Sequence, residues 1–85
     1  MQTTDIFEAL SALVVERYGT PATPLEPGTR QSDLAIDSIL MLDLLMDIED
    51  RFGFRFRSME LPRDPALSDL VALIESSLAA ARPGP

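Results

Sequence analysis

The sequence predicts an all-α fold: a small helical bundle of three main helices and one short helix, third in chain order, with a long first loop. Three segments, at about residues 5–18, 38–52 and 69–81, carry apolar residues at helical spacing. The one alternating stretch, from Phe52 to Phe56, has no second strand to pair with. Because 46% of the 85 residues are apolar and lie along the whole chain, we expect a single domain over 1–85, folded at about 5–81.

The first helix is predicted from about Asp5 to Tyr18. Asp5 and Glu8 resemble a capping pair, and Gly19 followed by Pro21 ends the helix. Residues 19–33 should form an extended loop, because their prolines fix φ and lack an amide donor. A loop of this length is typical of functional or crossover connections. The residues expected to bury the helix and pin the loop are Ile6, Leu10, Leu13, Val14 and Leu25.

The second helix is predicted from Ser38 to Phe52, just before Gly53. At about 100° per residue, it has a broad apolar side and an opposite, charged side on which Leu40 is the one apolar residue. The apolar side consists of Met41, Leu42, Leu44, Leu45, Ile48 and Phe52, and the charged side of Asp43, Asp47, Asp50 and Arg51.

The remaining chain is predicted to fold as a loop, a short turn and a last helix. Phe52, Phe54 and Phe56 should insert into the core from an extended loop, and the prolines at 62 and 65 allow at most one short helical turn. The last helix is expected at about 69–81, with Ser68 as its N-cap and residues 82–85 as a loose tail. Its predicted buried stripe is Leu70, Leu73, Ile74 and Leu78.

The composition excludes many kinds of site. The chain has no Cys, no His and no Lys, which excludes disulfides, Cys or His metal sites, and nucleophiles activated by His or Lys. A net charge of −7 argues against nucleic acid as a partner. No apolar run approaches the roughly 18 residues of a membrane span, and no signal peptide is evident. We expect a cytoplasmic monomer that is not an enzyme and binds no metal.

Ser38 allows two interpretations. It or Asp37 could simply be the N-cap of the second helix, because capping serines are common. Alternatively, its hydroxyl could be a site of modification, since Ile36 and Ile39 would anchor the backbone on both sides. A helix N-terminus also stabilises a phosphate ester through its free amides and its dipole.

The run DLAIDSILMLDLLMDIEDRFGFRF, residues 33–56, resembles the core of acyl and peptidyl carrier proteins. Asp37-Ser38-Ile39 matches the D-S-L or D-S-I motif that opens the second helix in that family, and the order of helices and loops is similar over nearly the whole chain. The resemblance implies that a phosphopantetheinyl transferase attaches 4′-phosphopantetheine from coenzyme A to Ser38. It also implies that Asp37 helps the transferase and its metal ion recognise the site, and that the arm's thiol holds cargo as a thioester.

Two positions depart from the family pattern. Fatty-acid carriers typically have acidic or polar residues just after the motif, whereas Leu40 and Met41 follow it here. Like carriers of polyketide and nonribosomal peptide systems, this one is expected to offer partners an apolar patch ringed by Asp43, Asp47 and Asp50. Ala35 stands where carriers often have glycine. The expected partners are loading, condensing or tailoring enzymes with basic or apolar docking surfaces. The residues predicted to contact them are Ile39, Leu40, Met41, Asp43 and Asp47.

The sequence therefore predicts a freestanding acyl carrier protein, because the chain begins with Met1 and ends soon after the last helix. Polyketide or related secondary-metabolite biosynthesis, such as that of an antibiotic, is the expected setting. The alternative within the class is a peptidyl or aminoacyl carrier of a nonribosomal peptide system. The alternative from another class is an acidic helical adaptor without a prosthetic group.

Overall fold

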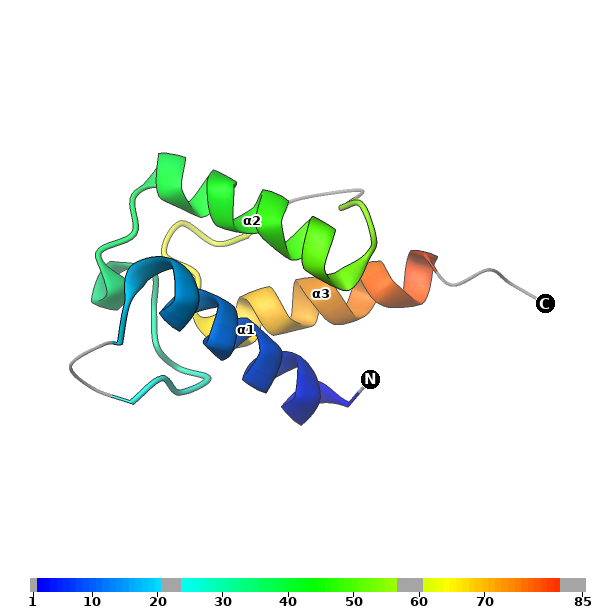
Figure 1. Cartoon of the computed structure of the whole chain (residues 1–85), viewed down its shortest axis with the longest axis horizontal. Helices are drawn as coiled ribbons and strands as arrows, with labels where there is room; N and C mark the ends of the chain where they lie inside the picture. The colour runs from blue at the N-terminus through cyan, green and yellow to red at the C-terminus, as the bar shows by residue number, and fades with distance from the viewer. Residues whose placement is uncertain (1, 21–23, 57–60, 82–85) are drawn as a thin grey trace.

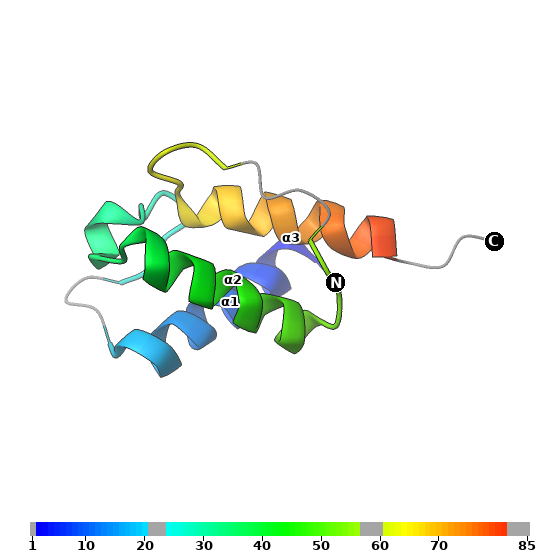
Figure 2. The same ribbon diagram turned by 90° about the horizontal axis from the view of Figure 1, so that it is seen from above.

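The computed structural model describes residues 2–20, 24–56 and 61–81. They form three α-helices, α1 (Thr3–Tyr18), α2 (Ser38–Phe52) and α3 (Leu67–Ala81), and a 3₁₀ turn, η1 (Ser32–Leu34). In Figure 1, α1 runs in one direction while α2 and α3 run in the other, and Figure 2 shows the same arrangement from above. The described residues contain no strand, only an isolated bridge between Arg30 and Ala66. The predicted all-α fold is confirmed.

α1 starts two residues earlier than predicted, and its cap differs. The amide of Gln2 donates to the Asp5 carboxylate at 3.1 Å, so Asp5 caps from inside the first turn and does not pair with Glu8. An acidic residue at the third helical position satisfies this amide while also facing the positive end of the helix dipole. Gly19 closes the helix at φ 87°, and its amide donates to the Val15 carbonyl at 2.9 Å. The four residues predicted to be buried in α1 are buried.

α2 begins and ends at the predicted residues. Gly53 follows it in the left-handed conformation, at φ 75° and ψ 38°, and donates to the Glu49 carbonyl. Leu42, which the helical pattern places on the apolar side, is not buried, because 52% of it is exposed. At about 100° per residue, Leu42 lies roughly 110° from the centre of the buried stripe, where neither α1 nor α3 covers it. The buried residues of α2 are Met41, Leu44, Leu45 and Ile48.

The phenylalanines after α2 enter the core from a loop, as predicted. Phe54 is buried, and its ring meets that of Phe56 edge to face with centroids 4.9 Å apart. Glu49 holds this loop against α2: its carbonyl accepts from the amide of Phe54, and its carboxylate accepts from the amide of Phe56 at 2.8 Å. The amides of Phe54 and Phe56 therefore bond to Glu49 of α2 and not to a neighbouring strand.

α3 starts at Leu67, two residues before the predicted start, and packs on α1. Ser68 lies inside the first turn and is not the N-cap; the amide of Ala66 donates to the Asp69 carboxylate at 2.8 Å instead. Leu73 and Leu78 are only half-buried. The buried apolar residues of α3 are Leu67, Leu70, Val71 and Ile74.

The short helix does not lie between the prolines at 62 and 65, where the chain only bends. The short helix of the described residues is η1, before α2. Residues 57–60 and the predicted loose tail at 82–85 lie outside the described part of the chain. Among the described residues, no helix combines the length and the apolar character that crossing a membrane requires.

Candidate functional site

The N-terminus of α2 is capped by Asp37. Its backbone is extended, at φ −81° and ψ 179°, and its carboxylate accepts from the amide of Leu40 at 2.8 Å. Its carbonyl accepts from the amide of Met41, also at 2.8 Å. Asp37, and not Ser38, is therefore the N-cap of α2.

Ser38 is the first residue of α2, and it is exposed. The Ser38 hydroxyl forms no hydrogen bond with any of the described residues. It is not needed as a cap, because the Asp37 carboxylate already fills that role. The first-turn amides of Ser38 and Ile39 remain available beside it, together with the positive end of the helix dipole. The hydroxyl is therefore free for chemistry, in a place that favours an attached phosphate.

The chain reaches Ser38 through a tight turn. After η1, Ala35 adopts the left-handed conformation, at φ 55° and ψ 36°, and it is the one residue other than glycine with positive φ in the described chain. Gln31 closes this turn from both sides. Its carbonyl accepts from the amide of Ile36 at 3.3 Å, and its side-chain amide donates to the Ile36 carbonyl at 2.6 Å. Carriers often have glycine at the position of Ala35, and the left-handed backbone conformation found here is one that glycine adopts without strain.

The segment before α3 holds this turn from outside. The Asp64 carboxylate accepts from the amide of Ser32 at 2.9 Å and from its hydroxyl at 2.8 Å. These two bonds and the nearby charge of Arg30 lower the pKa of Asp64 below its ordinary value. In addition, the amide of Gln31 donates to the Pro65 carbonyl at 2.9 Å. Two segments about 30 residues apart in the sequence therefore fix the approach to Ser38.

The outer side of α2 carries an apolar row next to Ser38. Ile39, Leu42 and Met46 are 79%, 52% and 56% exposed, and their spacing places them on one face of the helix. We call these three residues the outward stripe. Leu40 is exposed as predicted, at 37%, but on the side toward α1. The prediction that Met41 faces a partner is wrong, because only 8% of it is exposed and it packs in the core.

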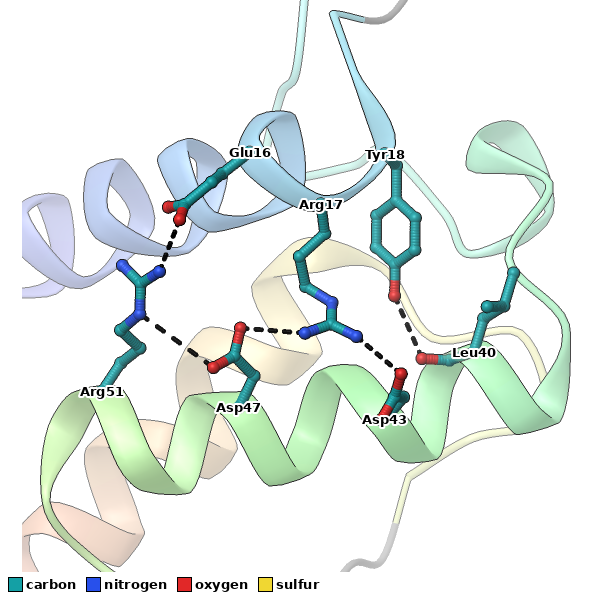
Figure 3. Close-up of polar contacts among 7 residues, drawn as sticks. All are labelled: Glu16, Arg17, Tyr18, Leu40, Asp43, Asp47 and Arg51. Atoms are coloured by element: carbon teal, nitrogen blue, oxygen red, sulfur yellow. Dashed lines mark hydrogen bonds and ion pairs between the residues drawn. The ribbon is translucent and has the colours of Figure 1, made fainter.

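Two acidic residues of α2, Asp43 and Asp47, face α1, which sequence reasoning missed. Arg17 donates to Asp43 at 2.6 Å and to Asp47 at 3.0 Å, reaching between them as Figure 3 shows. Arg51 pairs with Glu16 at 2.7 Å in the same network. The predicted ring of aspartates around an apolar docking patch is therefore corrected for the two paired residues: Asp47 is only 23% exposed, and Asp43 keeps 61% of its side chain exposed while paired. The signal for this contact is Arg17, which stands at the spacing of the buried residues Leu10, Leu13 and Val14 of α1.

The same network ties α1 to the first turns of α2. The Tyr18 hydroxyl donates to the Leu40 carbonyl at 3.0 Å. Bonding to Tyr18 and Asp47 and the charge of Asp43 raise the pKa of the Arg17 guanidinium, which therefore stays charged. The described residues contain no cluster of three or more acidic side chains arranged to hold a metal ion. These acidic residues are thus part of the structural frame beside Ser38.

Comparison with known proteins agrees with this geometry. The family described as "Phosphopantetheine attachment site" matches residues 8–74, a segment that includes all of α2. An acyl carrier protein of Helicobacter hepaticus is 32% identical over 74 residues, which cover 86% of this chain and 97% of the relative. No solved structure matches the chain. The chain therefore belongs to the phosphopantetheine-attachment family and, within it, to the acyl carrier proteins, which hold a covalent 4′-phosphopantetheine and are carriers rather than enzymes.

Proposed function

We propose that Ser38 is the residue to which 4′-phosphopantetheine is attached. The observation that carries the proposal is the division of roles at the start of α2: Asp37 makes the cap, and the exposed Ser38 hydroxyl has no bond within the described residues. The available amides of Ser38 and Ile39 suit the negative charge of a phosphodiester.

Attachment would form a phosphate ester bond to Ser38 and break the phosphoanhydride bond of coenzyme A. The Ser38 oxygen forms a bond to the phosphorus that bears the pantetheine arm in coenzyme A. The bond from that phosphorus to the adenosine 3′,5′-bisphosphate part breaks, the bisphosphate leaves, and the hydroxyl proton passes to a base of the transferase. When bound, the arm supplies a terminal thiol that holds an acyl group as a thioester, which this chain without cysteine cannot supply itself.

Asp37 serves this site in two proposed ways. Its carboxylate and carbonyl fix the first turn of α2, which holds the backbone of Ser38 at the surface with its side chain exposed. We also propose that the transferase and its metal ion recognise the remaining exposed part of this carboxylate.

The outward stripe is the proposed docking surface for the transferase and for enzymes that load or use the acyl group. It lies on the same helix as Ser38, and its three side chains are exposed and apolar, the character of the centre of a protein interface. Of the residues predicted from the sequence to contact partners, Ile39 belongs to this surface, and Leu40 and Asp43 lie beside it. Met41 does not belong to it because it is buried. Leu42 and Met46 are new members of the surface. Asp47 contributes through its pair with Arg17.

For the cargo, we propose an intermediate of polyketide or related secondary-metabolite biosynthesis. The support is the apolar character of the helix just after Ser38, in place of the acidic residues of fatty-acid carriers. The alternative cargo is an aminoacyl or peptidyl group. Loading by an acyltransferase, with no loading by an adenylation enzyme, would favour the first, and the reverse result would favour the second.

The decisive experiment is intact-protein mass spectrometry after incubation with coenzyme A, magnesium and a broad-specificity phosphopantetheinyl transferase. The wild type should gain the mass of one arm and Ser38→Ala none. Ser68→Ala is the matched control, because Ser68 is also an exposed serine in the first turn of a helix, and this variant should be modified normally. An arm on Ser38→Ala would contradict the assignment. No arm on the folded wild type with several transferases would favour the acidic adaptor without a prosthetic group.

A further inference from the structure

Gln31 occupies an unusual position in the turn before Ser38. Its carbonyl and its side-chain amide bond to the amide and to the carbonyl of the same residue, Ile36. The side-chain bond is short, at 2.6 Å, and partly buried. Between Gln31 and Ile36 lie η1 and the left-handed Ala35. The two hydrogen bonds that link Gln31 with Ile36 therefore join the two ends of the turn.

The carbonyl that Gln31 holds lies directly before the cap. Ile36 is buried, and its carbonyl belongs to the peptide that leads into Asp37. Rotation of this peptide would turn the extended backbone of Asp37 and move its carboxylate away from the Leu40 amide, which it contacts at 2.8 Å. Because Ser38 follows the cap immediately, the backbone that carries its hydroxyl would shift as well.

Gln31 is itself held from the segment before α3. Its amide donates to the Pro65 carbonyl, and its neighbour Ser32 is bound twice by Asp64. A continuous series of hydrogen bonds therefore runs from Pro65 through Gln31 and Ile36 to the cap of α2. This series approaches Ser38 from the side of the loops, while the Arg17 network holds α2 from the side of α1.

We propose that Gln31 is a positioning residue for modification of this carrier, which fixes the backbone that carries the Ser38 hydroxyl by holding the Ile36 carbonyl. The inference rests on attachment of the arm at Ser38. Gln31 touches neither the hydroxyl nor the outward stripe, so it acts on the rate of transfer within the complex and not on docking. A pre-set nucleophile lowers the reorganisation that the transfer step requires, and a misplacement of about 1 Å can cost on the order of a hundredfold in rate.

The test compares the kinetics of arm attachment to Gln31→Met and Gln31→Glu with those of the wild type. Both variants keep the approximate length of the side chain and lose the side-chain amide that donates to the Ile36 carbonyl. The methionine is neutral, whereas the glutamate adds a negative charge. We expect kcat to fall about tenfold in both, with KM changed less than about twofold because the outward stripe is intact. Far-ultraviolet circular dichroism of each variant checks that it is folded.

Glu49→Ala is the matched control. Glu49 also bonds a backbone group through its side chain, the amide of Phe56, but from the other end of α2, about 16 Å along the helix from Ser38. It should lose stability and keep the wild-type kcat. An unchanged kcat in the folded Gln31 variants, or an equal fall in Glu49→Ala, would overturn the role of Gln31. Absence of any arm on the wild type would instead overturn the attachment at Ser38, and the inference with it.

Discussion

Replacement of Ala35 by glycine should stabilise this protein, although most replacements by glycine destabilise. Ala35 is exposed and left-handed, at φ 55° and ψ 36°, between η1 and the cap of α2. In this conformation the Cβ of an L residue lies too close to the following carbonyl oxygen, at a cost of about 1–2 kcal/mol. Glycine has no Cβ and adopts the same conformation without that cost.

The expected gain follows from two opposing terms. Removing the Cβ relieves about 1–2 kcal/mol in the folded state. Glycine also gives the unfolded chain more freedom, which costs about 0.4–1 kcal/mol. The difference is a stabilisation of about 0.5–1 kcal/mol, which in a domain of this size raises Tm by about 2–8 °C.

Urea unfolding followed by circular dichroism measures this gain, with Ala72→Gly as the control. Ala72 is also exposed but lies inside α3, where glycine should cost about 1 kcal/mol. The same chemical change should thus have opposite signs at the two positions. If Ala35→Gly destabilised the protein as much as Ala72→Gly, residue 35 would not be left-handed in solution and the account of the turn would fail.

Four further changes test the described contacts through unfolding. Asp37→Ala should cost about 1 kcal/mol because the cap is lost, whereas no loss would place the cap elsewhere. Ser11→Ala should gain about 1 kcal/mol, because the buried Ser11 oxygen has no partner within the described residues; a loss would reveal one. Arg17→Gln should lower Tm, and about 1 M salt should shrink the difference; a salt-independent difference would contradict an ion-pair effect. For Asp64, the lowered pKa means that its contribution is present above about pH 4 and is lost as pH falls through the folded-state value; Asp64→Asn should lack this decline, and equal pH slopes would refute it.

The sequence alone was sufficient for the parts of the fold that local pattern determines. The periodic apolar residues located all three helices, and the motif helix was placed to the residue because Gly53 ends it and Asp37 starts it. Helix starts elsewhere were missed by two residues, because either of two nearby acidic or hydroxyl residues could supply the cap. Choosing between such caps requires the direction in which the chain arrives, which depends on tertiary contacts.

The assignment of charged residues failed for a related reason. Asp43 and Asp47 lie on the outer half of a helical wheel, and a wheel shows only angles about one axis. Whether such a residue meets solvent, a partner or another helix depends on where α1 passes, and here Arg17 at the end of α1 reaches both aspartates. The short helix was misplaced because η1 depends on the hydrogen bonds of Ser32 to Asp64, a contact across the chain that no local pattern contains.

The serine at the start of α2 is explained by what its neighbour does. Serine at this position would be a poor choice for the helix interior and a redundant choice for capping, since Asp37 already bonds the Leu40 amide. The two functions that serine could combine are thus divided between adjacent residues, so a modification of Ser38 leaves the cap intact. If Ser38 were the cap, loading the arm would require the helix to lose its first hydrogen bond. With the cap one residue earlier, the proposed attachment of an arm to Ser38 would leave α2 and its outward stripe in their present geometry.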